Sequence, residues 1–186
     1  MSNRWSRSRL AGMALGALAV TMAAAPAGAA RIGARFGWVS VPDAGEDAMM
    51  FGAFLRSGAG LGLEGAVDYR TEELGGGGEL RTWPITASLV VTPVPVAYAL
   101  AGIGWYQTTL DFPPELLIEK KTESKVGYHV GAGVQFPVFP PISLIGDVRY
   151  AYIDYDFGEA VDAVADFDGG SYVTVHVGAM LHFPSR

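Results

Sequence analysis

Histidine and serine residues are the groups in this chain that could support hydrolytic chemistry. A nucleophilic site needs a serine close to a histidine, with an acid that orients the histidine ring. The three histidines, His129, His176 and His182, are each followed by an apolar residue and then by glycine or proline. Ser88 and Ser143 have no histidine near them along the chain. We therefore expect no catalytic residues and no enzyme, although folding could still bring a serine and a histidine together.

The sequence also lacks the groupings typical of metal and phosphate sites. It contains no cysteine, which excludes thiolate ligands and disulfides. Acidic residues gather between Asp156 and Asp168, but without the spacing and the closing glutamate of a calcium loop. The Gly75–Gly78 run lacks the Lys-Ser/Thr pair of a phosphate loop. We interpret these segments as a solvated acidic loop and a flexible loop tip, and expect no metal and no cofactor.

A further set of ionisable residues occurs at alternate positions in otherwise apolar or glycine-rich segments. The set is Arg35, Glu64, Asp68, Arg70, His129, Asp147, Arg149 and His176. If these side chains share a narrow interior, they must pair with one another, because an unpaired buried charge is very unfavourable. We predict a structural network that fills this interior, with Arg149 paired to an acid on a neighbouring strand. A gated pore or a proton path is the alternative.

Eight segments with the character of β-strands would position these residues. They are 31–41, 48–57, 61–70, 80–91, 94–108, 125–138, 142–155 and 171–183. Each is about 10 to 15 residues long, which is the length that a tilted strand needs to cross a bilayer. Strands of soluble proteins have about half that length. The pattern therefore predicts membrane-spanning strands.

The connections between these segments alternate in length. Tight Gly/Pro-rich turns are expected at Ser57–Gly60, Thr92-Pro93 and Phe139–Pro141. The longer and more polar connections are 42–47, 71–79, 109–124 and 156–170. Outer-membrane barrels have short turns on the periplasmic side and long loops outside. An even number of strands then places both chain ends in the periplasm.

Apolar residues alternate with small or charged residues along most of these segments. In the last one, Val173, Val175 and Val177 alternate with Thr174 and His176. A soluble barrel would turn its apolar face inward around a ligand, whereas a membrane barrel turns it outward to lipid. The opposite face combines glycines with charges, which suits a narrow lumen. The chain also has only three lysines, too few for a wet exterior. The pattern therefore favours the membrane barrel.

Aromatic residues near the ends of the segments indicate the two membrane interfaces, where aromatic girdles form. The residues expected there are Trp38, Tyr69, Trp83, Trp105, Tyr106, Phe136, Tyr152, Tyr155 and Phe183.

The first thirty residues have the features of a secretory signal peptide. Arg4, Arg7 and Arg9 precede an apolar run, which ends in small residues at 25–30. The apolar run is shorter than the roughly 20 residues of a spanning helix. We predict a signal peptide at 1–30 and a barrel domain at 31–186. Without the signal peptide, 10 basic residues stand against 19 acidic ones, which argues against a nucleic-acid partner.

The stretches 127–137 and 142–150 resemble a hairpin of the small eight-stranded outer-membrane barrels, the opacity-protein and OmpA-like family. In sequence they read GYHVGAGVQFP and ISLIGDVRY. The resemblance covers nearly the whole chain after the signal peptide. It implies an all-β fold, an eight-stranded antiparallel up-and-down transmembrane β-barrel in the cell outer membrane of a Gram-negative bacterium. It says almost nothing about function.

The last segment resembles the family's insertion signal, which the barrel-assembly machinery reads. The matching residues are His176, Gly178, Leu181 and Phe183. Family members usually end on the aromatic residue, whereas this chain continues with residues 184–186. The resemblance implies the assembly machinery, outer-membrane lipids and lipopolysaccharide as partners, with slower assembly because of the extra residues.

Three functions are compatible with such a barrel. We expect a structural or surface-interaction role, in which the long connections 42–47, 71–79, 109–124 and 156–170 meet an extracellular ligand. A small passive pore is the second possibility. The third is a lipid A-modifying acyl hydrolase, an activity that some small barrels of this kind have. The His-x-Ser pairing of those enzymes is missing from this sequence.

Overall fold

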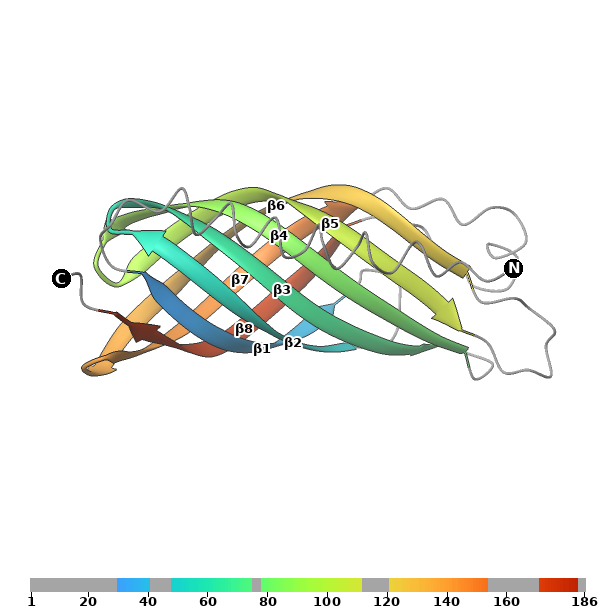
Figure 1. Ribbon diagram of the computed structural model, residues 1–186, viewed down its shortest axis with the longest axis horizontal. Coiled ribbons are helices and arrows are strands. Elements are labelled where there is room, and N and C mark those ends of the chain that lie inside the picture. Colours follow the sequence, from blue (N-terminus) through green and yellow to red (C-terminus); the bar gives the residue numbers. More distant parts are fainter. Residues whose placement is uncertain (1–29, 41–47, 75–77, 112–120, 154–170, 184–186) are drawn as a thin grey trace.

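The computed structural model describes residues 30–40, 48–74, 78–111, 121–153 and 171–183, which form eight strands. The predicted signal peptide lies almost wholly outside the described residues. The strands are β1 (Arg31–Ser40), β2 (Ala48–Gly58), β3 (Leu61–Leu74), β4 (Gly78–Val94), β5 (Ala97–Asp111), β6 (Lys121–Phe139), β7 (Ile142–Ile153) and β8 (Ser171–His182). Each strand pairs antiparallel with the next, and β8 pairs with β1. The predicted closed eight-stranded up-and-down barrel is confirmed (Figure 1).

The tight turns lie at one end of the barrel, together with the start of β1 and the end of β8. Arg31 at the start of β1 faces His182 at the end of β8. Gly58 enters the first turn with a φ of 86°, in the left-handed region that favours glycine. We call this the turn end, and the opposite one, to the right in Figure 1, the loop end. No helix in the described ranges has the length and hydropathy needed to cross a membrane.

Several predicted boundaries were wrong, because the central strands are longer than the sequence pattern indicated. The expected loop 71–79 is mostly strand, since β3 continues to Leu74 and β4 begins at Gly78. The expected loop 109–124 likewise begins and ends inside β5 and β6. Polar residues interrupt the alternation of apolar side chains at the loop end. The backbone hydrogen bonds between strands continue there, because they do not depend on apolar side chains. Residues 154–155, expected in β7, lie outside the described residues.

The turn expected at Thr92-Pro93 was also wrong. Both residues belong to β4, and the chain turns at Pro95-Val96. The register of β4 against β5 shifts between Val91 and Val94. A proline cannot donate to the ladder, so such an irregularity is where a strand accommodates it.

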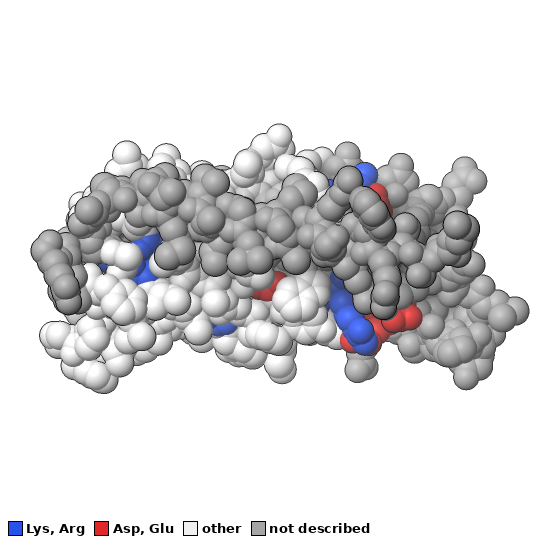
Figure 2. Space-filling view, in the orientation of Figure 1, with Lys and Arg blue, Asp and Glu red and all other residues white. Residues whose placement is uncertain are grey.

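The outer face of the barrel is apolar, as predicted. Its exposed side chains include Phe36 and Trp38 on β1, Leu144 and Val148 on β7, and Val175 on β8. Among the described residues, charged side chains at outward positions occur only toward the loop end. In Figure 2 the described residues of this face are mostly white, and the largest blue and red areas lie toward the right, with smaller ones at the left and near the centre. This surface is suited to hydrocarbon rather than to water.

The aromatic girdle matches the prediction at several positions and fails at one. Phe51, Tyr69 and Trp83 stack side by side on the outer face, with ring centroids 5.2 and 4.6 Å apart. Tyr106 instead points into the lumen and is buried. The half of strand β5 nearer the turn end reverses the usual contrast, because Tyr98 and Leu100 point inward and the alanines point outward. Tyr155 lies outside the described residues.

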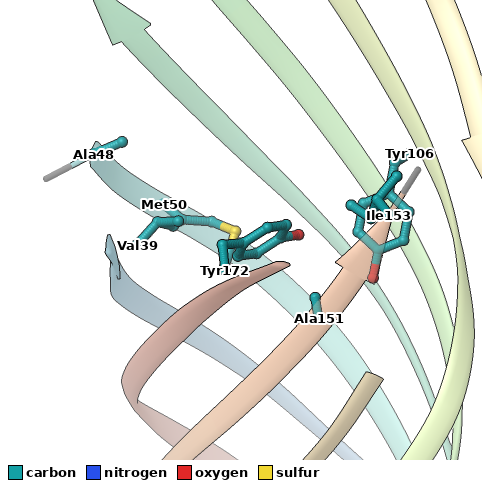
Figure 3. Packing of buried hydrophobic residues seen from close by; sticks show 7 residues of the cluster. All are labelled: Val39, Ala48, Met50, Tyr106, Ala151, Ile153 and Tyr172. Carbon is teal, nitrogen blue, oxygen red and sulfur yellow. The ribbon is translucent and has the colours of Figure 1, made fainter. Parts of the chain in front are cut away.

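Apolar side chains close the lumen at both ends. The larger cluster lies at the loop end, where Tyr172 lies edge-on to Tyr106 with ring centroids 6.4 Å apart (Figure 3). Its members are Val39, Ala48, Met50, Tyr106, Ala151, Ile153 and Tyr172. Two clusters lie nearer the turn end, one around Phe54 and Met180 and the other around Val90 and Leu100. Between these layers the lumen is polar.

Candidate functional site

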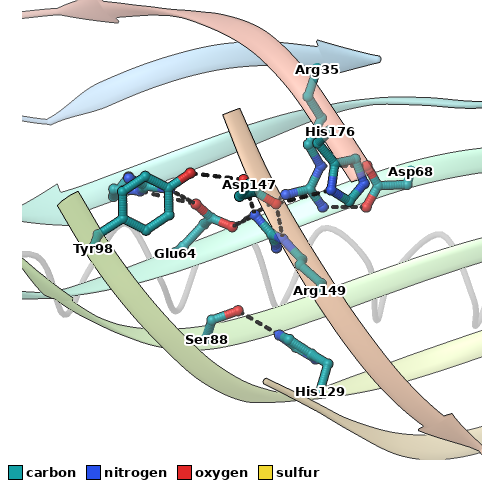
Figure 4. Close-up of polar contacts among 10 residues, drawn as sticks. Arg35, Glu64, Asp68, Ser88, Tyr98, His129, Asp147, Arg149 and His176 are labelled. Carbon is teal, nitrogen blue, oxygen red and sulfur yellow. Dashed lines mark hydrogen bonds and ion pairs between the residues drawn. The ribbon is translucent and has the colours of Figure 1, made fainter. Parts of the chain in front are cut away.

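A belt of polar side chains crosses the middle of the lumen (Figure 4). Every strand from β1 to β8 contributes at least one member. All members carry ionisable or hydroxyl groups, and the apolar layers lie on either side of them. We call this set the polar belt. It consists of Arg35, Arg56, Glu64, Asp68, Ser88, Tyr98, His129, Asp147, Arg149 and His176, all of them buried.

Glu64 is the acid around which three arginines of the belt gather. Arg56 donates to its Oε2 from Nη2 at 2.6 Å and from Nε at 3.0 Å. Arg149 approaches its Oε1 at 3.0 Å and Arg35 at 3.3 Å. The side chain of Glu64 is 1% exposed, so these contacts replace almost all of its hydration. One carboxylate thus joins guanidinium groups from β1, β2 and β7, and a buried acid requires such partners.

Asp147 is the second centre of the belt. Arg149 donates to its two oxygens at 2.7 and 3.2 Å, in the bidentate geometry that makes Arg–carboxylate pairs strong. Tyr98 donates its hydroxyl to Oδ2 at 2.8 Å. His176 Nδ1 lies 3.0 Å from Oδ1. The contacts of this aspartate therefore tie β5 and β8 to β7.

Arg35 joins two carboxylates of β3, since it contacts Glu64 and binds both oxygens of Asp68. The guanidinium of Arg56 lies 4.1 Å from the ring centroid of Tyr98, a cation–π contact. The buried charges balance among the described residues. Four arginines, at 35, 56, 70 and 149, face four acids, at 64, 68, 72 and 147.

Ser88 and His129 form a separate pair within the belt. The Ser88 hydroxyl lies 2.7 Å from His129 Nε2, a contact that their separation in sequence did not indicate. His129 Nδ1 has no hydrogen-bond partner among the described residues, so no acid orients the ring. A second pair, Ser143 and His182 at 2.8 Å, lies near the turn end. Within the described strands, neither histidine has an acid as the third member of a nucleophilic triad.

The structure places all eight predicted network residues inside the barrel. Seven belong to the polar belt, whereas Arg70 lies outside it and pairs with Glu72 at 3.6 Å. The prediction that Arg149 pairs with an acid on a neighbouring strand was wrong. Its partners are Asp147 on its own strand and Glu64 across the lumen, because a narrow barrel brings β3 and β7 within reach of long side chains. The structural role of these residues stays a prediction.

The sequence interpretation missed Arg56, Tyr98 and Glu72 as lumen residues and considered Ser88 only as a nucleophile. Arg56 and Tyr98 lie on β2 and β5, where large and small residues do not alternate clearly. Glu72 fell in the expected loop 71–79. The pairing of β2 with β3 would have identified Arg56 as a lumen residue, since it lies opposite Glu64 in the ladder.

Glycines on neighbouring strands make room for the belt. A Cβ on Gly37 would lie 2.6 Å from the ring of His176, and one on Gly133 would lie 2.6 Å from the ring of Tyr98. Real Cβ atoms do not approach that closely, so the bulky inward residues need bare backbone beside them. This explains why glycine rather than alanine occupies these inward positions.

The four predicted assembly-signal residues run from the middle of β8 to just past its last residue. Leu181 and Phe183 are exposed on the outer face, whereas His176 points into the lumen. Gly178 faces Arg35 across the β1–β8 ladder. Their reading by the assembly machinery stays a prediction. Within the described ranges, no group of three or more His, Cys, Asp or Glu could hold a metal ion.

Several outer-membrane proteins of known structure share this architecture. NspA, a Neisserial surface protein, superposes with a TM-score of 0.60 at 17% identity, covering 85% of this chain and 98% of its own. Ail, the attachment invasion locus protein of Yersinia pestis, gives 0.57 at 17% identity, covering 84% and 99%. OprG from Pseudomonas aeruginosa gives 0.54 at 14%, covering 86% and 98%. At these identities the likeness shows the fold.

Comparison with curated proteins gives no sequence match. The family model described as outer membrane protein beta-barrel domain, however, matches residues 10–183, nearly the whole chain. Together with the closed barrel and its apolar outer face, this match establishes where the protein resides. The chain belongs to the outer-membrane β-barrel family, and its place is the outer membrane of a Gram-negative cell.

Proposed function

We propose that this protein is a closed, non-conducting barrel whose loop end is a surface for interaction with extracellular partners. The observation that carries the proposal is the closure of the lumen at three levels. The apolar layer around Tyr106 and Tyr172, the polar belt, and the apolar layer around Phe54 and Met180 follow one another along the barrel axis. An eight-stranded barrel is narrow enough for side chains to fill it.

The loop end supports the proposed interaction surface, because the barrel wall there continues past the apolar outer face with polar residues. Thr71, Arg81, Thr109 and Thr122 are neighbours in one row across β3 to β6. We call this row the polar rim. Thr109 and Thr122 share a hydrogen bond of 3.1 Å, and Arg81 pairs with Glu79. The rim lies beyond the girdle residues Tyr69 and Trp83, so it projects into water rather than lipid.

A rigid wall that projects beyond the membrane is a suitable base for binding loops, which carry specificity in many folds. The strands β3 to β6 have 14, 17, 15 and 19 residues, against 10 to 12 for the other four. A barrel with only a structural role in the membrane does not need this extension. Its partner is expected among molecules outside the cell, such as matrix, host, phage or immune factors.

Whole-cell binding tests this proposal. Cells that display the protein would be compared with cells displaying a variant in which 112–120 and 154–170 are replaced by short Gly/Asn turns. The matched control carries a Gly-Ser insertion at Ala59-Gly60, at the opposite end of the barrel. We expect retention on immobilised matrix proteins or serum proteins to fall at least tenfold for the first variant and to stay unchanged for the control.

Two results would contradict the proposal. Equal retention of both variants would show that the loop end is not the interaction surface, as would retention no greater than that of cells lacking the protein. Stepwise conductance of the refolded protein in a planar bilayer would favour the passive pore. Release of fatty acid from lipopolysaccharide, lost in Ser88→Ala, would favour the acyl hydrolase.

A further inference from the structure

A small cavity lies inside the lumen where the polar belt meets the apolar layer at the loop end. Its volume is about 30 Å³. A water molecule needs roughly 10–15 Å³ measured in this way, so the space fits one or two. Arg149, His129 and His176 line the cavity from the belt, and Tyr106 and Tyr172 from the apolar layer.

Four buried polar atoms without a hydrogen-bond partner in the described strands belong to residues that line this cavity. Arg149 Nη1, His129 Nδ1, His176 Nε2 and Thr86 Oγ1 are buried without a hydrogen bond among the described residues, and all four residues line the space. Arg149, His129 and His176 are each at least 95% buried. An unsatisfied buried polar atom is unfavourable, so four such atoms around one space indicate a bound polar ligand.

We propose that the cavity is a binding site for water that bridges His129 to Arg149 and His176. The direct contacts leave the belt in two parts, because the Ser88–His129 pair of β4 and β6 makes no hydrogen bond to the other belt members. Water in the cavity would connect that pair to the network around Asp147. The polar belt would then be continuous around all eight strands. This inference is independent of what the loop end binds.

The hydrogen-bond roles at the site select water over an ion. Asp147 accepts from Arg149 and Tyr98, so the nearby His176 Nδ1 must carry the hydrogen of their contact. In a neutral imidazole the other nitrogen, Nε2, is then an acceptor. Arg149 Nη1 can only donate. A ligand in contact with both must accept one hydrogen bond and donate another, which water does and a halide does not.

The charge balance supports the neutral ring. The four buried arginines already face four buried acids, so a proton on His176 would leave an uncompensated positive charge in the lumen. A cation in the cavity is disfavoured for the same reason, because Arg35 and Arg149 both line it.

A crystal structure of the refolded protein, with a parallel bromide soak, tests the proposal. We expect water density within hydrogen-bond distance of both Arg149 Nη1 and His176 Nε2, and no anomalous bromide signal in the cavity. Bromide at this position would make it an anion site and overturn the assignment. A cavity without density would also overturn it.

A double-mutant cycle tests the bridge in solution. His129→Leu removes one end, and His176→Asn keeps a donor for Asp147 but removes the acceptor at Nε2. Because both ends are expected to share the bridging water, their effects on the folding equilibrium constant should deviate from additivity by about fivefold. His129→Leu combined with Thr108→Val, whose hydroxyl contacts Thr82 away from the cavity, should be additive. Additivity in the first cycle would contradict a water bridge.

Discussion

The outer face and the lumen of this barrel are built on different rules. Outward residues such as Val148 and Val175 need only be apolar, because lipid imposes no particular shape on them. Inward residues such as Glu64 and Asp147 need named partners at hydrogen-bond distance. The same strands therefore carry one surface specified by composition and another specified by individual contacts. Substitutions should reveal this difference as unequal tolerance.

Glu64→Ala should have the largest effect, because it removes the acid that three guanidinium groups share. We expect a loss of about 3–5 kcal/mol in the free energy of unfolding, as for other broken buried ion pairs. Denaturant titration of the barrel in lipid vesicles measures it. Glu79→Ala, which breaks the half-exposed pair with Arg81, is the matched control and should cost much less, because water screens that pair. Similar losses for both would show that the belt does not stabilise the barrel.

Val175→Asp tests the outer face. A charge toward the hydrocarbon is expected to cost about 2–4 kcal/mol or to block assembly, and Val134→Asp should behave alike. Val175→Leu should be neutral, since composition alone matters there. The band shift between heated and unheated samples on gels reports assembly, and denaturant titration reports the energy. Full stability of both aspartate variants would mean that the faces are reversed.

Tyr98→Phe should have an intermediate effect. It keeps the ring under the Arg56 guanidinium but removes the hydroxyl that donates to Asp147. Hydrogen bonds to charged groups contribute about 1.5–3 kcal/mol, and Asp147 retains its other partners, so we expect the lower end of that range. The free energy of unfolding is again the measurement. A stabilised variant would contradict the hydrogen bond.

Ala101→Leu should have the smallest effect, because Ala101 is exposed on the outer face of β5. We expect a change within about 0.5 kcal/mol. Gly133→Ala is the inward counterpart, and its added Cβ would lie 2.6 Å from Tyr98 and from Asp147. Overpacking of this kind costs about 1–3 kcal/mol. Equal tolerance at the two positions would remove the contrast between wall and lumen.

The sequence predicted the outer face well because that face depends on composition. The alternation of apolar with charged residues identified six of the eight buried charges of the lumen before any pairing was known, and the structure added Arg56 and Glu72. Strand number and the closed topology followed from the same periodicity and from the turn residues.

The lumen contacts could not be predicted, because they depend on register and barrel shape. The pairing of Glu64 with Arg149 links strands far apart in the sequence, and no local pattern encodes it. Tyr106 was predicted at the interface and Tyr98 was missed, because alanines rather than large residues take the outward positions beside Tyr98 on β5. The loop-end extensions of β3 to β6 were missed because their polar residues resemble loop sequence, although the ladder continues there.

The orientation of adjacent residues on β8 tests the central claim most directly. The chain has no cysteine, so single spin labels can be placed at Val175→Cys and Thr174→Cys. Val175 is 43% exposed on the outer face, and Thr174 is 3% exposed in the lumen. In lipid vesicles, we predict that collisions with dissolved oxygen are frequent for the label at 175 and rare for the label at 174. Frequent collisions at 174 and rare ones at 175 would contradict the account.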